Sequence, residues 1–377
     1  MTDSPRAFDL AVVGAGILGL SCALAAARRG LKVVVIERSL RAGGASVRNF
    51  GLVTVTGQDR DTVWRRARRS REIWQEVTRE AGIPVVHRGL WLAARRAESA
   101  VLLDAFLRSD MAEGCELLSS SAALRRCPRL QSSGLQAVLC SPHELRVESR
   151  DAIPKLADWL AHAFGVVFRW QTAVHAVDPP RLETSRGPVS AQAAVVCPGD
   201  DFVSLFPEQL AKAGVGRCRL QMLRLESPGF ELPATVMSDL SLLRYGGFSS
   251  LPAAGALRRR LEAEQPEYLR HGIHLIIVQG SDGSLVVGDS HHYGAAANEL
   301  FAAEAVYDLL LQEYQAVTGE PPPAVRERWM GTYAVADDRG LFIETPSRGI
   351  RLVLVTSGVG ASVGFAVGEE VIGDLFA

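Results

Sequence analysis

Apolar residues open the chain in the pattern of a β-α-β unit. The short apolar run Phe8–Val13 is followed by the glycine turn Gly14–Gly19, a small-residue helix over Ile17–Arg29 and a β-branched run over Lys32–Ile36. Short apolar runs bounded by glycine predict buried strands, and the segment between them predicts a helix that packs on the sheet. The chain therefore begins as an α/β protein.

Helical and extended patterns alternate along the remainder, without an internal repeat. Helical periodicity covers Asp61–Ala81, Glu98–Gly114, Ala152–Phe164, Ala256–Glu264 and Leu300–Thr318, with an irregular helical turn at Leu117–Leu130 and a terminal helix after Gly358–Gly364. Extended runs occupy Val85–Ala94, Val166–Trp170, Ala173–Val177, Ala193–Val196, Gln221–Leu225, His274–Val278, Leu285–Val287, Leu341–Glu344 and Arg351–Val355. A Ser281-Asp282-Gly283 turn between two of these runs predicts a hairpin.

Length and composition favour a soluble globular protein of two domains. The chain has 377 residues, 47% hydrophobic and 22% charged, with a formal net charge of -1, which does not favour nucleic acid as a partner. No apolar stretch reaches the roughly 18 residues of a membrane span, and Phe8–Leu20 lacks the basic flank of a signal peptide. We therefore expect a cytoplasmic protein without a membrane partner. The six cysteines have no metal-binding spacing, so no metal site is predicted and they are interpreted as reduced packing residues.

The glycine turn has the spacing of a dinucleotide-binding loop. Gly14-Ala15-Gly16-Ile17-Leu18-Gly19 follows a strand and opens a helix, and Glu37, followed by Arg38, ends the next strand. Gly14 permits the tight turn, Gly16 lets backbone amides approach a pyrophosphate, and Gly19 lets the helix pack closely. Glu37 can accept ribose hydroxyls and disfavours a 2′-phosphate. The alternative, a glycine-rich loop without a ligand, is less favoured because every part of the motif is in register.

A small-residue loop then distinguishes FAD from NAD. A nicotinamide-binding fold would normally start its next helix after Glu37, but here the chain continues as a loop that can run along a ribityl chain and under a flavin ring. The residues of this loop expected to contact the cofactor are Gly44, Ala45, Ser46, Arg48, Asn49, Phe50 and Gly51.

Together these motifs resemble the D-amino-acid oxidase superfamily, and within it the glycine oxidase and sarcosine oxidase type of FAD-dependent amine oxidase. The resemblance implies further cofactor contacts from Val174, Cys197, Gly199, Gly331 and the segment Ser357, Gly358, Val359, Gly360 and Ala361. It implies that this last segment places a helix N-terminus beside the flavin, where negative charge grows on reduction. A second NAD site at Gly358–Gly364 is disfavoured because no strand and acidic residue follow it. No cysteine follows Cys218, so a covalent tether in the C-terminal region is excluded and the FAD is expected to be non-covalent.

The resemblance also implies the reaction and the architecture. A hydride passes from the carbon beside an amine nitrogen to flavin N5, the imine is hydrolysed, and O₂ or another acceptor reoxidises the flavin. The implied fold is α/β, with a Rossmann-like FAD-binding domain (residues 1–85, 146–216 and 325–377) and a second, α+β substrate domain (86–145 and 217–324). The second domain is expected to contain a mixed, mostly antiparallel sheet.

An anionic small-molecule substrate would need a cationic clamp, and arginine suits carboxylate or phosphonate oxygens. The candidates for substrate contact are Arg48, His143, Arg146, Arg150, Trp329 and Tyr333. Surface salt bridges among Glu144, Arg146, Glu148 and Arg150 are an equally good interpretation of the 143–150 segment, and a core position is the default for the two aromatics.

The substrate itself is left open by the sequence. The combination of the 44–51 loop with the segment Pro142–Arg150 resembles a branch associated with organophosphonate breakdown, which implies a substrate such as N-methyl-2-aminoethylphosphonate. The alternatives are an oxidase of glycine, sarcosine or a D-amino acid, a 2-hydroxyacid dehydrogenase with His274 or His291 as base, and a flavin-binding protein without catalysis.

Overall fold

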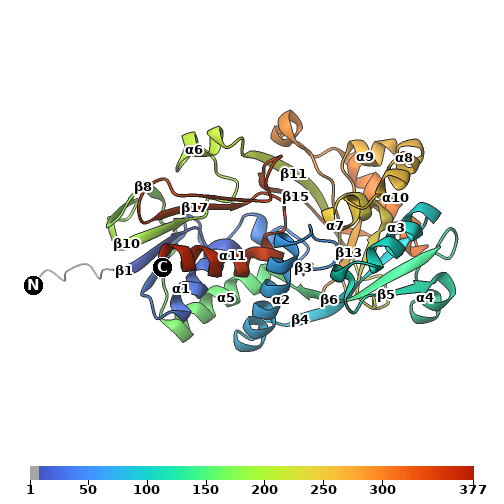
Figure 1. Ribbon diagram of the computed structural model, residues 1–377, viewed down its shortest axis with the longest axis horizontal. Helices are drawn as coiled ribbons and strands as arrows, with labels where there is room; N and C mark the ends of the chain where they lie inside the picture. The colour runs from blue at the N-terminus through green and yellow to red at the C-terminus, as the bar shows by residue number, and fades with distance from the viewer. Residues whose placement is uncertain (1–7) are drawn as a thin grey trace, which may run out of the picture.

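The computed structural model describes residues 8–377, and their strands form two sheets (Figure 1). The first sheet has the order β16-β17-β10-β1-β2-β7, with its strands parallel except for the antiparallel edge pair β16–β17. A β8–β9 hairpin extends it from β10. The strands are β1 (Phe8–Val13), β2 (Val33–Ile36), β7 (Val167–Arg169), β8 (Val174–Asp178), β9 (Arg181–Thr184), β10 (Val189–Val196), β16 (Leu341–Glu344) and β17 (Ile350–Val355).

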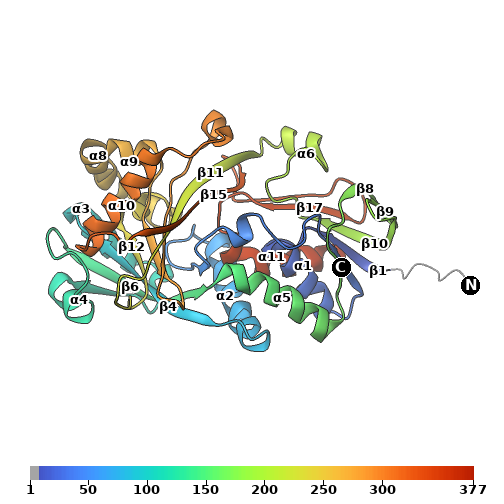
Figure 2. The ribbon, with the colours of Figure 1, turned by 180° about the vertical axis from the view of Figure 1, so that it is seen from behind.

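Four helices form a layer with one face of this sheet. They are α1 (Ile17–Arg28), α2 (Thr62–Glu80), α5 (Ser149–Phe164) and α11 (Gly360–Leu375). Helix α11 packs on both α1 and α2, and α1 also packs on α5 (Figures 1 and 2). Small residues permit this approach, since a Cβ on Gly368 would lie 2.6 Å from the backbone carbon of Ser21. A smaller apolar cluster beneath the β8–β9 hairpin covers the other face. The short helix α6 (Pro207–Lys212) lies beside this sheet.

The second sheet has the order β15-β11-β14-β13-β12-β4-β6-β3, with β5 paired to β6. Its pairings are antiparallel apart from β12–β4. The strands are β3 (Leu52–Val53), β4 (Val85–Ala94), β5 (Glu116–Ser119), β6 (Ala137–Val147), β11 (Gly216–Leu225), β12 (Thr235–Ser238), β13 (Ile276–Gln279), β14 (Leu285–Gly288) and β15 (Val325–Val335). The expected mixed, mostly antiparallel second sheet is thus confirmed.

Short helices cover the second sheet and share one apolar core with it. The α-helices are α3 (Ala97–Leu107), α4 (Ser120–Arg126), α7 (Gly246–Ser249), α8 (Ala254–Glu264), α9 (Pro266–Arg270) and α10 (Glu304–Thr318). The described residues also form short 3-10 helices at η1 (Ala45–Val47), η2 (Asp110–Ala112), η3 (Asp239–Leu243) and η4 (Gly294–Asn298). Among the described residues, no helix is both long and apolar enough to cross a membrane.

Six strands were not expected from the sequence, namely β3, β5, β6, β9, β12 and β15. Strand β5 and helix α4 lie where an irregular helical turn was expected, at Leu117–Leu130. The longest of the six strands are β6 and β15. Strand β6 carries Glu144 and Arg146 in its interior, and both are buried, so its polar residues conceal the apolar pattern. Strand β15 lies at the edge of its sheet and alternates exposed and half-buried positions. The helices expected over 98–114 and 300–318 are shorter, because α3 ends at Leu107 and α10 begins at Glu304.

Three separate segments of the chain contribute strands to the first sheet, namely residues 8–36, 167–196 and 341–355. The second sheet is built from residues 52–147 and 216–335, and it includes β15, which the sequence-based division grouped with the FAD-binding segment. The domain boundaries given above stay a prediction.

Candidate functional site

A cavity of about 910 Å³ lies at the carboxyl ends of the parallel strands of the first sheet. The last residues of four of these strands line it, namely Val13, Ile36, Val196 and Val355. This is the edge at which open α/β sheets bind their ligands. The volume is at the upper end of the range for small-molecule and cofactor sites. Residues from the second sheet, including Leu220, Met222 and Ile276, complete the lining.

The glycine turn leaves its backbone open toward this cavity. Gly14 has φ +103°, and a Cβ there would lie 2.5 Å from the carbonyl oxygen of Cys197. A Cβ on Gly19 would lie 2.0 Å from the Gly14 oxygen, so only glycine lets α1 start this close to β1. Gly16, Ile17, Leu18 and both of these glycines line the cavity. The N-terminus of α1 therefore offers amide groups and positive potential to an anion.

Glu37 is held in place at the end of β2. Its Oε2 accepts a hydrogen bond from the Ala15 amide at 3.0 Å, and its Oε1 accepts one from the Ser39 amide at 2.9 Å. Ala15 is buried behind the cavity lining, so its role is to position this carboxylate. Each oxygen retains a lone pair for a ribose hydroxyl. Arg38 lines the rim and pairs with Asp201.

The loop over residues 44–51 is fixed by its own polar groups. Ser46 Oγ accepts from the Ile17 amide at 2.9 Å, which ties the loop to the start of α1. Asn49 donates to the Ala45 oxygen at 2.7 Å and accepts from the Gly51 amide at 2.7 Å. Gly51 has φ +67° and lies against the Val147 carbonyl instead of lining the cavity. The loop residues that do line it are Gly44, Ala45, Ser46, Arg48, Asn49 and Phe50.

The C-terminal segment reaches the same cavity. Ser357, Gly358, Val359, Gly360 and Ala361 all line it, and α11 begins within this segment at Gly360. Val174, Cys197, Gly199 and Gly331 line it as well. The N-termini of two helices far apart in sequence thus face one cavity, which suits a cofactor with a pyrophosphate and an electron-accepting ring.

The candidates for substrate contact fall into two groups. Tyr333 and Arg48 line the cavity, whereas His143, Arg146, Arg150 and Trp329 do not. The Trp329 Nε1 donates to the Arg48 carbonyl at 3.2 Å, and the guanidinium of Arg150 lies 5.3 Å from the Trp329 ring centroid. Trp329 therefore supports the loop from outside.

His143 and Arg146 on β6, and Arg150 in the first turn of α5, have other partners. Arg146 is 1% exposed and its Nη2 lies 3.0 Å from Glu148 Oε2, which also pairs with Arg224 at 3.3 Å. Arg150 pairs with Glu327 at 2.7 Å. His143 Nε2 lies 2.5 Å from the Glu113 carbonyl. Of the surface salt bridges expected among Glu144, Arg146, Glu148 and Arg150, the structure contains the Arg146–Glu148 pair, in which Arg146 is buried. Arg150 pairs outside this set, and all three side chains are engaged away from the cavity.

Arg244, which was not expected in the site from the sequence, is a cation inside the cavity. Its Nη2 donates to the Tyr333 hydroxyl at 3.1 Å and to the Ser357 carbonyl at 3.4 Å. Its buried Nε has no hydrogen-bond partner. The guanidinium is therefore oriented from one side and has donors left for an anionic ligand. It follows η3, which carries no recognisable motif.

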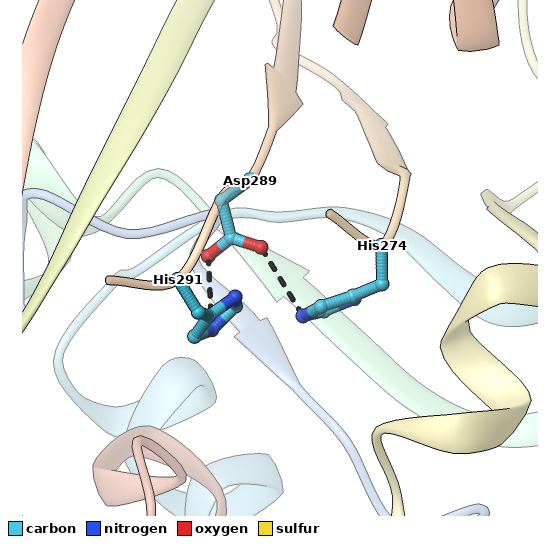
Figure 3. Close-up of side chains that lie close together, drawn as sticks. All are labelled: His274, Asp289 and His291. Atoms are coloured by element: carbon cyan, nitrogen blue, oxygen red, sulfur yellow. Dashed lines mark ion pairs between the residues drawn. The ribbon is translucent and has the colours of Figure 1, made fainter. Parts of the chain in front are cut away.

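His274, Asp289 and His291 form a buried cluster that also lines the cavity (Figure 3). Asp289 Oδ1 lies 3.2 Å from His274 Nε2, and Asp289 Oδ2 lies 3.8 Å from His291 Nε2. Burial raises the pKa of Asp289 to about 8, although the positive charge of Arg244 opposes this. Burial, and then the charge of Arg244, lowers the pKa of His291 to about 3, and burial lowers the pKa of His274 as well. The histidines are therefore neutral.

The sequence contains a signal for part of this cluster. The polar run Asp289-Ser290-His291-His292-Tyr293 follows an apolar strand directly, and polar residues at the end of a strand often face a site. From the sequence, His274 and His291 were expected only as possible bases for a hydroxyacid, and Asp289 was not expected in the site.

Comparison with known proteins assigns the chain to a family. Residues 9–373 match the DAO family, described as FAD dependent oxidoreductase. The chain belongs to this family. FAD is accordingly the cofactor of this oxidoreductase, and the cavity fits it through the open glycine turn, the fixed Glu37 and the start of α11.

Solved structures of similar fold cover almost the whole oxidoreductase. Glycine oxidase from Bacillus cereus is 16% identical with a TM-score of 0.77, over 98% of this chain and 95% of that chain. L-proline dehydrogenase from P. horikoshii is 17% identical with a TM-score of 0.78, over 98% and 93%. Iminodiacetate oxidase from Chelativorans is 18% identical with a TM-score of 0.72, over 97% and 95%. At these identities the likeness shows the fold alone. No curated protein sequence matches the chain significantly.

Proposed function

We propose that this oxidoreductase oxidises a small amine that carries an anionic group, at the bond between carbon and nitrogen. The observation that carries the proposal is Arg244, a guanidinium with free donors inside the cofactor cavity. The names of the structural neighbours add support, because glycine, proline and iminodiacetate each combine an amine with a carboxylate. An anion bound at Arg244 would fix the amine end of a short molecule within the same cavity.

The chain supplies binding, orientation and exclusion of water. When bound, FAD accepts the hydride from the carbon beside nitrogen. The N-terminus of α11 places positive potential in the cavity. Tyr333 orients Arg244 through its hydroxyl, and burial lifts the pKa of Tyr333 well above 10, so the hydroxyl stays protonated. Phe50, Leu220 and Ile276 contribute apolar walls that keep water from the reacting bond.

The substrate to be tested first is an aminophosphonate such as N-methyl-2-aminoethylphosphonate. The resemblance of the 44–51 loop and the 142–150 segment to the organophosphonate branch motivates this choice. The 142–150 side chains do not line the cavity, so Arg48 and Arg244 would have to hold the phosphonate. A guanidinium suits the oxygens of phosphonate as well as those of carboxylate.

Flavin reduction under anaerobic conditions tests the proposal. The purified holoenzyme is mixed with N-methyl-2-aminoethylphosphonate, sarcosine, glycine, D-alanine and a 2-hydroxyacid, and the loss of flavin absorbance is followed. We expect rapid reduction by the phosphonate. Fast reduction by an amino acid without reduction by the phosphonate would replace the aminophosphonate with an amino acid as substrate. Subsequent addition of O₂ with detection of H₂O₂ identifies the acceptor.

A second candidate, a 2-hydroxyacid dehydrogenase, is favoured by the cavity histidines. A hydroxyl proton must be removed during hydride transfer from an alcohol, and the neutral His274 and His291 line the cavity. Reduction of the flavin by the 2-hydroxyacid, and by none of the amines, would establish this function instead.

A further inference from the structure

We propose that His274, Asp289 and His291 bind one divalent transition-metal ion, with zinc as the representative ion. The three side chains come from the segments that flank the β13–β14 hairpin, and their ligand atoms lie within 4.8 Å of one another. Two imidazole nitrogens and one carboxylate oxygen are a known ligand set for zinc and for ferrous iron. The site is distinct from the cofactor contacts made by the glycine turn and by α11.

His291, two residues after Asp289, is oriented as a metal ligand. His291 Nδ1 lies 3.0 Å from the Gly272 carbonyl oxygen, which can only accept, so Nδ1 carries the proton. The neutral ring therefore presents a lone pair at Nε2, the atom that faces Asp289. Metal-bound histidines usually donate their other ring N–H to a carbonyl or carboxylate in this way.

His274 is oriented in the same sense from the other side of the hairpin. Its Nδ1 lies 3.4 Å from Ser241 Oγ, and this hydroxyl in turn lies 3.4 Å from the Leu275 carbonyl, to which it donates. The other ring nitrogen of His274, Nε2, lies 3.2 Å from Asp289 Oδ1. Both imidazoles therefore direct Nε2 toward one carboxyl group.

Asp289 is not fully satisfied in its buried position. It is 6% exposed, and its buried Oδ1 accepts no hydrogen bond. Among the described residues its ion-pair partners are the two histidines. A buried carboxyl oxygen that faces an imidazole lone pair is unfavourable without a proton or a metal ion between them. A divalent ion would satisfy all three groups, whereas a single proton would satisfy one pair.

The ligand atoms of the cluster would have to move slightly closer together to bind a zinc ion. Zinc bonds to nitrogen and oxygen are about 2.0–2.2 Å long, which places adjacent ligand atoms about 3.3 Å apart in a tetrahedral site. The His274–Asp289 separation of 3.2 Å already has this length, and the His291–Asp289 separation is 3.8 Å. A fourth position would open toward the cavity that all three residues line. There the ion would lie in the same cavity as Arg244 and could bind an oxygen of an anionic substrate.

Metal content tests the proposal without any substrate. The untagged holoenzyme is treated with a chelator, incubated with ZnCl₂, freed of excess metal by gel filtration, and analysed for zinc and FAD. We expect about one tightly bound zinc per FAD. Asp289→Asn and His291→Ala should reduce zinc to background while FAD binding and the far-UV spectrum remain. His292→Ala is the matched control, because His292 is adjacent but outside the cluster, and it should retain the zinc.

X-ray absorption at the zinc edge supplies a second readout, for which we expect imidazole ligands at about 2.0 Å. The proposal is overturned if the unmodified enzyme binds no more zinc than Asp289→Asn, or if His292→Ala loses zinc to the same extent as His291→Ala. Either result would leave a shared proton as the cation of the cluster. Flavin reduction by an amine is measured separately, so failure of the metal site does not imply failure of the proposed activity.

Discussion

Replacement of Arg244 by glutamine should weaken substrate binding more than any other arginine substitution in or near the cavity. Its guanidinium is oriented by Tyr333 and Ser357 and keeps donors free. Hydrogen bonds to charged groups contribute about 1.5–3 kcal/mol each, and removal of one partner of a buried charged pair costs about 2–5 kcal/mol. We therefore expect a loss of about 2–4 kcal/mol, which is about 30- to 900-fold at 1.36 kcal/mol per tenfold.

The assay is the concentration dependence of anaerobic flavin reduction, which separates the dissociation constant from the limiting rate. Arg244→Gln should raise the dissociation constant for N-methyl-2-aminoethylphosphonate or sarcosine. It should have little effect on reduction by N-methylethylamine, which lacks the anionic group. Arg150→Gln is the matched control, because Arg150 pairs with Glu327 outside the cavity, and it should change the constant by less than about twofold.

Two outcomes would refute this reasoning. The first is an Arg244→Gln enzyme that binds the anionic amine as tightly as the Arg150→Gln enzyme does. The second is an equal loss for the anionic amine and for N-methylethylamine, since that would mean that Arg244 shapes the cavity without contacting the anion.

Two further predictions concern stability, measured by urea unfolding. Gly368→Ala should destabilise the protein by about 1–3 kcal/mol because its Cβ would meet the Ser21 backbone at 2.6 Å. Gly373 lies in the same helix, but a Cβ there would meet no atom within 4 Å, so Gly373→Ala should stabilise the protein by about 0.5–1 kcal/mol. Equal effects of the two substitutions would contradict the close packing of α1 and α11. Burial, and then the positive charge of Arg146, lowers the pKa of His87 from 6.5 to about 4, so neutral His87 is favoured in the folded state. The contribution of neutral His87 to the unfolding free energy is complete above pH 6.5. About 3 kcal/mol of this free energy is lost as the pH falls toward 4. His87→Phe should flatten the unfolding free energy over this pH range, and an unchanged slope would show that other groups cause the acid sensitivity.

The residues that line the cofactor part of the cavity could be predicted from the sequence because they belong to short local motifs. A glycine turn between a strand and a helix needs specific residues at fixed spacing, and Glu37 follows at the end of the next strand. All the cofactor residues named from the sequence line the cavity except Ala15 and Gly51, which instead hold Glu37 and the loop in position. Residues expected to contact the cofactor through their backbone can therefore be predicted once the fold is recognised.

The residues proposed to hold the substrate could not be predicted from the sequence, because their position depends on how segments far apart in the chain pack together. Arg146 and Arg150 are as cationic as Arg244, but they are bound to Glu148 and Glu327 away from the cavity. Arg244 reaches the cavity from a short segment after η3 that has no distinctive spacing.

The buried cluster depends on strand pairing in the same way. The predicted Ser281-Asp282-Gly283 turn gave the hairpin, but the proximity of His274 to Asp289 follows only when the pairing of the two flanking segments is known. In the structure their backbones exchange hydrogen bonds of 3.3 and 3.1 Å.

The late position of α11 in the chain sets an order of events during biosynthesis. Strand β17 and the segment Ser357–Ala361 emerge from the ribosome long after the glycine turn, yet both belong to the same cavity. A nascent chain that ends before these residues has neither its complete parallel sheet nor its second helix N-terminus. Flavin capture must therefore wait until Ser357–Ala361 and α11 have been translated, and termination upstream of Ser357 should yield a colourless product.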